Sequence, residues 1–288
     1  GTTGEVYKGK VETKAAEVSG DFAALMDLCN KYTKLNVRTN ADTPHDAEVA
    51  RAFGASGIGL CRTEHMFFDA EKIVAMREMI LSPDVEGRRK ALAKLLPFQK
   101  ADFKGIFKAM DGCPVNVRLL DPPLHEFVPH DAKGQEEMAK AMGVTVQEIK
   151  KRVESLCEHN PMLGHRGCRL GNTYPEITEM QTQAILGAAI ELKKEGYDPH
   201  PEIMVPLTGI LYEFEAQEKV IRDAAAALFE KEGMEIPFKV GTMIEIPRAA
   251  LTANRIASRA EYFSFGTNDL TQMTILLLSC RYIWKRRF

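Results

Sequence analysis

The sequence predicts an α/β fold: a (β/α)8 barrel of parallel strands that lacks its last β/α unit. Two observations carry this prediction. Short apolar segments alternate with longer helical patterns along most of the chain, as in folds that cover a parallel sheet with helices. Polar residues follow several of these segments, which is typical of a barrel whose active site lies at the carboxyl ends of its strands. The 288 residues suffice for such a barrel, which usually takes about 250 residues.

Six short apolar segments are expected to form strands. A seventh, at 165–170, fits a strand less clearly because its sequence also suits a turn or the start of a helix. Counting the seventh gives seven β/α units, one fewer than a closed barrel has. The six segments are residues 35–39, 57–61, 115–119, 202–206, 240–246 and 262–265.

The segments between the strands show the apolar spacing of helices. A further segment, 131–158, is helical but strongly charged, so we expect it to form an insertion over one face of the barrel. The most regular helical segments are 71–80, 86–110, 176–195 and 213–232.

Composition excludes several classes of protein. The net charge of −2 offers no basic field to attract nucleic acid or a membrane surface, and no apolar run approaches the length of a membrane span. The six cysteines contain no CxxC pair, which argues against a structural zinc site and against a secreted disulfide framework. We therefore expect an intracellular protein. The cytoplasm is the first expectation for its location, and an organelle is the alternative.

Arginines lie at the ends of two expected strands. Arg62 directly follows the second expected strand, and Arg118 interrupts the apolar run of the third. A buried arginine needs an anionic partner, which is either a neighbouring carboxylate or a bound phosphate. Both interpretations stay open, because Glu64 and Asp121 are close in the sequence. Arg166 is a weaker candidate, since the local structure around it is ambiguous.

Two carboxylates follow neighbouring strands near the end of the chain. Glu245 lies in the segment GTMIEIPRAAL, and Asp269 lies just past the strand in FSFGTNDLTQM. Mg²⁺ prefers oxygen ligands and leaves room for substrate oxygens, so these two carboxylates are expected to share one Mg²⁺. Gly266 and Thr267 precede Asn268 and Asp269 at a strand-to-helix turn, where backbone N–H groups can meet an anion. With the arginines, this predicts a site for a small phosphorylated acid beside a divalent metal.

Residues 1 to about 274 resemble the C-terminal, phosphoenolpyruvate-binding domain of the pyruvate, phosphate dikinase family. Phosphoenolpyruvate synthase and enzyme I of the sugar phosphotransferase system share this architecture, and the resemblance implies a TIM-type barrel. The motifs that carry it are RTNADTP (38–44), GLCRTEHMFF (59–68), VRLLDPPLHEF (117–127), NPMLGHRGCRLG (160–171), GTMIEIPRAAL (241–251) and FSFGTNDLTQMT (263–274).

The resemblance also implies roles for residues. Arg62 and Arg118 match the arginines that hold the phosphate and bridging oxygen of the substrate, and Arg166 adds positive charge nearby. Glu245 and Asp269 match the Mg²⁺ ligands. The loop that meets the substrate carboxylate is matched by Gly266, Thr267, Asn268 and Asp269.

The implied reaction passes a phosphoryl group between a phosphohistidine and pyruvate, in either direction. The implied partners are phosphoenolpyruvate or pyruvate, upstream phosphohistidine and ATP-binding domains, and a second copy in a homodimer. The expected domains are the end of a swivelling phosphohistidine domain with its linker (1–20), the incomplete barrel (21–274) and a divergent tail (275–288). The cysteine that protonates the enolate in the family has no match here, so no catalytic residue is assigned and the chain alone is expected to be inactive.

Three other functions stay open. The chain could be a catalytically silent module that binds phosphoenolpyruvate and Mg²⁺, or part of an enzyme of the phosphoenolpyruvate synthase type. A metal-dependent lyase or aldolase acting on pyruvate enolates would also place a Glu and an Asp on barrel strands. The paired arginines and the NPMLGHRG segment make the lyase the weaker alternative.

Overall fold

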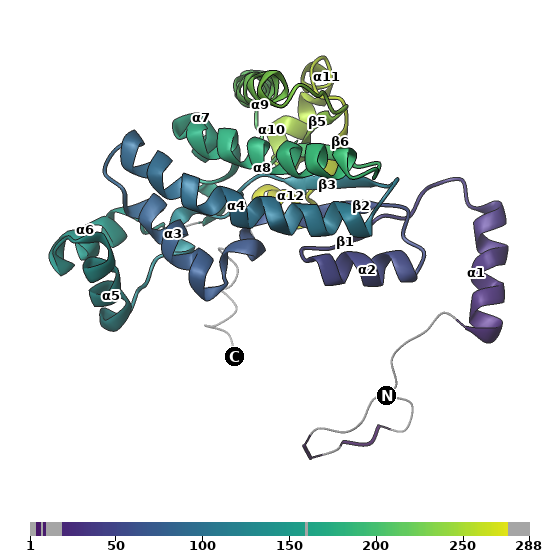
Figure 1. Cartoon of the computed structure of the whole chain (residues 1–288), viewed down its shortest axis with the longest axis horizontal. Coiled ribbons are helices and arrows are strands. Elements are labelled where there is room, and N and C mark those ends of the chain that lie inside the picture. Colours follow the sequence, from purple (N-terminus) through teal and green to yellow (C-terminus); the bar gives the residue numbers. More distant parts are fainter. Residues whose placement is uncertain (1–3, 7, 10–18, 159–160, 276–288) are drawn as a thin grey trace.

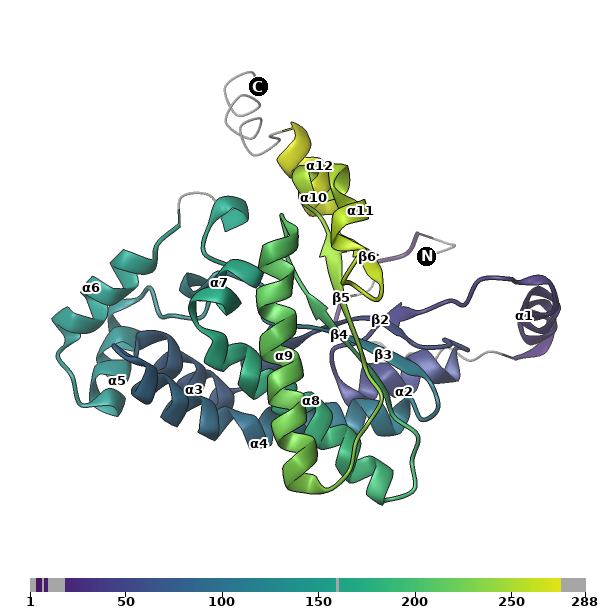
Figure 2. The same ribbon diagram turned by 90° about the horizontal axis from the view of Figure 1, so that it is seen from above.

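The centre of the molecule is one parallel sheet. The computed structural model describes residues 4–6, 8–9, 19–158 and 161–275. In these residues six strands lie side by side in chain order, each parallel to its neighbours (Figures 1 and 2). The predicted parallel α/β fold is therefore confirmed. The strands are β1 (Thr39–Asn40), β2 (Ile58–Arg62), β3 (Pro114–Arg118), β4 (His200–Val205), β5 (Lys239–Ile244) and β6 (Phe263–Phe265).

Helices connect the successive strands, as parallel pairing requires. Among the described helices, none combines the length and the hydrophobicity that a membrane-spanning helix needs. Three short 3₁₀ helices are Thr63–Phe67, Leu124–Glu126 and Pro161–Leu163. The α-helices are α1 (Gly20–Tyr32), α2 (Pro44–Ala52), α3 (Ala70–Leu81), α4 (Val85–Ala109), α5 (Ala132–Met142), α6 (Val146–Leu156), α7 (Gly167–Thr173), α8 (Pro175–Lys194), α9 (Leu211–Glu232), α10 (Pro247–Leu251), α11 (Ala253–Ile256) and α12 (Thr267–Ile275).

Local residues set the ends of several helices. The side chain of Asp84 accepts a hydrogen bond from the N–H of Gly87 at the start of α4. Thr145 and Glu148 form a reciprocal capping box at the start of α6. Gly143 follows α5 with a φ of 68°, a conformation that glycine adopts without steric cost. Each of these signals lies within a few residues of the helix end that it stabilises.

Side chains alternate between the two faces of the sheet. Val115 and Val117 of β3 are fully buried in the main core with Phe103 of α4. Asn116 and Arg118 therefore point to the opposite face, because neighbouring residues in a strand alternate. Helices α4, α8 and α9 cover the apolar face, and α4 packs along α8 (Figure 1). On β3, the face turned away from these helices therefore carries polar side chains.

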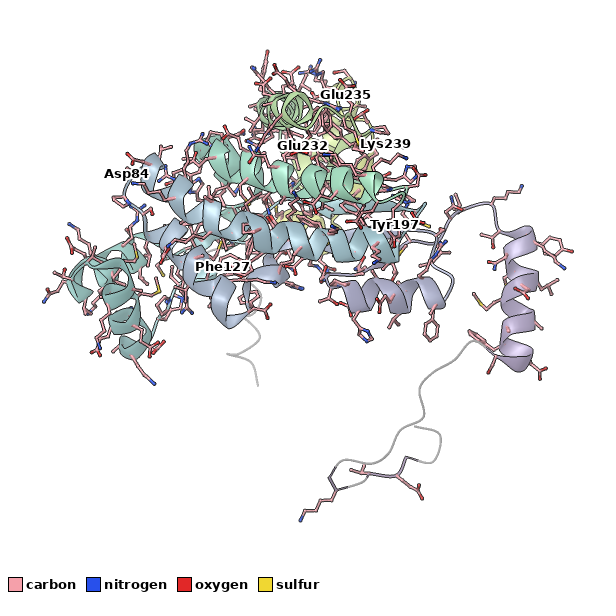
Figure 3. The ribbon with its side chains drawn as sticks, viewed as in Figure 1. Asp84, Phe127, Tyr197, Glu232, Glu235 and Lys239 are labelled. Atoms are coloured by element: carbon pink, nitrogen blue, oxygen red, sulfur yellow. The ribbon has the colours of Figure 1, made fainter. Side chains whose placement is uncertain are left out.

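A second apolar cluster lies beside the sheet, between α3, α4 and the pair α5–α6. It includes Met76, Leu95, Ile149 and Phe127, the last of which is labelled in Figure 3. The pair α5–α6 contacts α3 and extends at one end of the molecule, with α1 at the other (Figure 1). The helical prediction for 131–158 is therefore confirmed.

Two strand predictions are wrong. Residues 165–170 do not form a strand, because helix α7 occupies Gly167–Thr173. A short apolar run cannot be assigned to strand or helix by its periodicity alone. The segment 35–39 contributes only Thr39 to β1, and Leu35 and Val37 are exposed rather than buried. The described sheet thus has six strands, not seven.

The described sheet is open. Among the described residues β1 pairs only with β2 and β6 only with β5, so the ladder does not close into a ring. The structure supports a six-stranded parallel sheet of half-barrel form, which is coarser than the (β/α)8 barrel expected from the sequence.

Removing a core side chain tests the packing of α4 on the sheet. Phe103→Ala should lower the free energy of unfolding by about 3–5 kcal/mol, because the buried ring leaves a cavity. Lys90→Ala, on the exposed side of the same helix, should change it by less than about 0.5 kcal/mol. Urea unfolding followed by circular dichroism measures both, and equal effects would contradict this packing.

Candidate active site at the carboxyl edge

Charged side chains gather at the carboxyl edge, by which we mean the edge of the sheet where its strands end. Arg62 and Arg118 are the last residues of β2 and β3 and lie opposite each other in the sheet register. Glu245 directly follows β5, and Gly266 directly follows β6. Because all six strands are parallel, these ends meet at one edge. Figure 3 labels Lys239, which starts β5 and marks the opposite edge.

Asp121 joins two of the predicted arginines. Its Oδ2 atom lies 3.1 Å from Nη1 of Arg118 and 2.5 Å from Nη2 of Arg166. Arg118 also forms an ion pair with Glu64. Burial opposes the charge of Arg118, but Asp121 and Glu64 outweigh it and raise the pKa of the guanidinium above its ordinary value. The ion-pair interpretation is therefore confirmed for Arg118.

The ion-pair network is not fully satisfied. Nε of Arg118 and Oε2 of Glu64 are buried and have no hydrogen-bond partner. Buried polar atoms without a partner are uncommon in folded proteins, because each costs desolvation free energy. The network therefore retains one donor and one acceptor that a bound molecule can satisfy.

Arg166 connects the network to the last helix. It precedes α7, and its Nη1 atom lies 3.5 Å from Oδ1 of Asp269 on α12. Burial again opposes the charge, whereas Asp121 and Asp269 raise the pKa of Arg166. The neighbouring Arg169 is not part of this ion-pair network, because its side chain donates to the carbonyl of Gly164.

Arg62 is held by a residue that sequence reasoning missed. Asp42 accepts the backbone N–H of Arg62 at 2.7 Å, and its other oxygen lies 3.3 Å from Nη1 of Arg62. Nδ1 of His65 lies 2.8 Å from the same oxygen. The side chain of Arg62 is 33% exposed, against 10% for Arg118 and Arg166, which makes it the most accessible of the three guanidinium groups. The motif RTNADTP contains Asp42, but nothing in its local pattern indicates this pairing.

Glu245 is fully buried. Its Oε1 atom accepts the backbone N–H of Leu207 at 2.6 Å, whereas Oε2 has no partner. Burial, with the charges of Asp121 and Asp269, raises the pKa of Glu245 to about 8. A buried carboxylate oxygen without a donor is costly unless a cation compensates it.

Gly266 allows the end of β6 to approach Glu245 closely. A Cβ atom at position 266 would lie 2.5 Å from Oε2 of Glu245, so only glycine fits there. Thr267 and Asn268, in the first turn of α12, are exposed. The first N–H groups of a helix have no acceptor inside the helix and attract anions. The glycine thus places a helix N-terminus beside the buried carboxylate.

The carboxylates at this edge fit a small cation that prefers oxygen ligands. No group of three or more His, Cys, Asp or Glu side chains suited to a metal occurs among the residues that the structure describes. Mg²⁺ needs fewer, since it binds one or two carboxylates and completes its shell with water or substrate oxygens. Oε2 of Glu245 is available for such an ion, with the charge of Asp269 nearby. The roles of the eight predicted residues, including Thr267 and Asn268, stay predictions.

Comparisons with known proteins identify similar sequences. Residues 16–277 match the family model described as PEP-utilising enzyme, PEP-binding domain. The chain is 57% identical to pyruvate, phosphate dikinase from Clostridium symbiosum over 275 residues, which are 95% of this chain and 32% of that protein. It is 57% identical to the Giardia intestinalis dikinase, of which it covers 31%, and 55% identical to the chloroplastic dikinase 1 of rice, of which it covers 29%. The chain thus spans about a third of the length of these relatives.

The raised pKa of Glu245 predicts a pH-dependent stability. A carboxyl whose folded pKa of about 8 exceeds its ordinary 4.5 stabilises the fold fully below the ordinary value, and this contribution is lost as the pH rises through 8. Glu245→Gln cannot ionise, so it should lose less stability than the wild type between about pH 5 and about pH 9. Each pKa unit corresponds to about 1.4 kcal/mol, so the difference should reach a few kcal/mol.

Urea unfolding across this pH range measures the effect. Glu86→Gln, at an exposed carboxylate, is the control and should follow the wild type. Parallel stability curves for the wild type and Glu245→Gln would contradict the buried, proton-binding state of Glu245.

Proposed function

The chain belongs to the PEP-utilising enzymes, and on that premise we propose that it carries the phosphoenolpyruvate/pyruvate site of a Mg²⁺-dependent pyruvate, phosphate dikinase. The relatives named above are dikinases, which favours this enzyme over phosphoenolpyruvate synthase. The observation that carries the proposal is the unpartnered, buried Oε2 of Glu245 at an edge that also holds three arginines.

Glu245 and Asp269 would hold Mg²⁺. When bound, the ion supplies positive charge for the enolate and phosphoryl oxygens. In this proposal Glu245 binds as the ionised carboxylate, and the cation provides the compensating charge that the free chain lacks.

The arginines would bind the phosphate and the bridging oxygen. Arg62 is accessible and would present its guanidinium to the phosphate, because arginine forms paired hydrogen bonds with phosphate oxygens. Arg118, oriented by Glu64 and Asp121, would use its free Nε–H on the bridging oxygen. Asp121 and Asp42 hold the arginines before any ligand arrives, so little reorganisation is needed.

The carboxylate of the substrate would lie at the start of α12. The N–H groups of Thr267 and Asn268, in the first turn of α12, would donate to it. The N–H of Gly266 already donates to the carbonyl of Ile244, so Gly266 would contribute by its small size. Arg166 would add charge from the side, because it already contacts Asp269. The phosphate and the carboxylate of the substrate would then occupy two ends of one small site, and Glu245 and Asp269 would hold the metal.

The proposed fold and partners go beyond this chain. The open sheet would form part of a (β/α)8 barrel, and the phosphoryl group would come from a phosphohistidine on another domain. The ATP-binding domain and the homodimer belong to the same proposal, and the compartment stays a prediction. Because the phosphohistidine lies on another domain, the chain alone should not turn over phosphoenolpyruvate, AMP and pyrophosphate.

Calorimetry tests the proposal directly. Phosphoenolpyruvate titrated into the chain should bind with Mg²⁺ and bind much more weakly without it. Glu245→Gln removes a metal ligand and should abolish the dependence on Mg²⁺, whereas Glu86→Gln should leave it intact. Absence of binding by a cooperatively folded wild-type chain would contradict the proposal.

Arg62→Lys tests the assignment of the phosphate. Phosphoenolpyruvate should bind about tenfold to a hundredfold more weakly, because hydrogen bonds to charged groups contribute about 1.5–3 kcal/mol. Pyruvate has no phosphate, so its affinity should hardly change. Arg89→Lys, at an exposed ion pair, is the control. Equal losses for the two ligands would exclude a specific role of Arg62 in binding the phosphate.

A further inference from the structure

Leu207 has a strained backbone. It is the only non-glycine residue with a positive φ, 61°, in the parts of the chain that the structure describes. It lies two residues past β4, and its side chain is fully buried. A side chain in this left-handed conformation crowds its own backbone, so leucine rarely adopts it. Such a conformation persists only when its surroundings impose it, and it is often found at functional sites.

The strained peptide is directed at the candidate active site. Its N–H donates a hydrogen bond to Oε1 of Glu245 at 2.6 Å, and this hydrogen bond holds the buried carboxylate in place. Oε2 of the same carboxylate is left without a partner. An ordinary β conformation at Leu207 would turn the N–H away, because the direction of the peptide follows from the backbone angles.

Neighbouring residues impose the conformation. The thiol of Cys168 donates to the carbonyl of Leu207 at 3.1 Å, and the N–H of Cys168 donates to the carbonyl of Pro206 at 3.0 Å. A Cβ atom on Gly167 would lie 2.7 Å from Cβ of Leu207, so α7 has to begin with glycine for the two segments to meet. On the other side, the hydroxyls of Thr208 and Thr242 lie 2.8 Å apart. Residues 206–208 are therefore held between the start of α7 and strand β5.

We propose that Leu207 is a positioning residue for Glu245. Gly167 and Cys168 hold Leu207 in its left-handed conformation. In this conformation its N–H donates to Oε1 of Glu245, and Oε2 stays free to bind the cation at the carboxyl edge. The role in cation binding rests on the proposed function. The hydrogen bonds to metal-binding side chains commonly affect metal affinity by about 10–100-fold when they are removed.

The conformation is tested without any ligand. At ordinary positions Ala gives a more stable protein than Gly, because glycine leaves the unfolded chain more freedom. At Leu207 the order should reverse, since only glycine adopts the conformation without strain. Leu251→Ala and Leu251→Gly, at an exposed residue of α10 with negative φ, are the control and should keep the usual order. The usual order at both positions in urea unfolding would overturn the proposal.

The role in cation binding is tested with two substitutions of similar volume. Leu207→Ile is branched at Cβ and disfavours the left-handed conformation strongly, whereas Leu207→Met is unbranched. In calorimetry with phosphoenolpyruvate, the Ile variant should need about tenfold more Mg²⁺ for half-saturation, and the Met variant should stay within about threefold of wild type. Equal Mg²⁺ requirements in the two variants and the wild type would overturn the proposal.

A second pair keeps the test decisive if Leu207→Ile does not fold. Cys168→Ala removes the donor to the Leu207 carbonyl and should raise the Mg²⁺ requirement, whereas Cys168→Ser keeps a donor and should restore it. A purely structural role would lower stability in Cys168→Ala without changing the Mg²⁺ requirement, and would overturn the proposal. If the wild type does not bind phosphoenolpyruvate at all, the proposed function fails, while the Gly and Ala variants of Leu207 still decide whether the conformation is imposed.

Discussion

The carboxylate of Glu245 is held inside the protein by one backbone N–H, with its second oxygen unpartnered, and the carboxyl edge is arranged around that oxygen. Gly266 lets β6 pass close to it, because any side chain there would collide with the carboxylate. Leu207 has a strained, left-handed backbone conformation and donates its N–H to the other oxygen. A buried, incompletely bonded carboxylate lowers the stability of the fold, and in the proposed function a bound cation would offset this cost.

The arginines obey a related constraint. Guanidinium groups this deeply buried need carboxylates, and Asp121 serves both Arg118 and Arg166. The same ion pairs hold the arginines at the carboxyl edge, so the ion pairs are compatible with the ligand-binding roles proposed for these residues. An ion-pair network at a strand end is therefore compatible with ligand binding when some of its donors, such as Nε of Arg118, remain free.

Prediction from the sequence succeeded where the signal was local and failed where it was not. Strands β3 to β6 and the long helices follow from runs of apolar residues with a clear period. The segment 165–170 was misjudged because a short run of apolar and charged residues fits either a strand or a helix, and its packing against the 206–207 segment decides for α7. Asp42 was missed because its partner Arg62 lies 20 residues away along the chain.

The alternation of strands and helices and the polar residues at the strand ends follow from the order of the amino acids alone, because both depend on spacing within a few residues. Which of these polar residues meet depends on the fold as a whole. Arg166 reaches Asp121 across 45 positions and Asp269 across 103, and such pairs depend on the order and register of the parallel strands. The left-handed turn at Leu207 is likewise imposed by contacts with α7 and β5, since nothing in the leucine itself favours it.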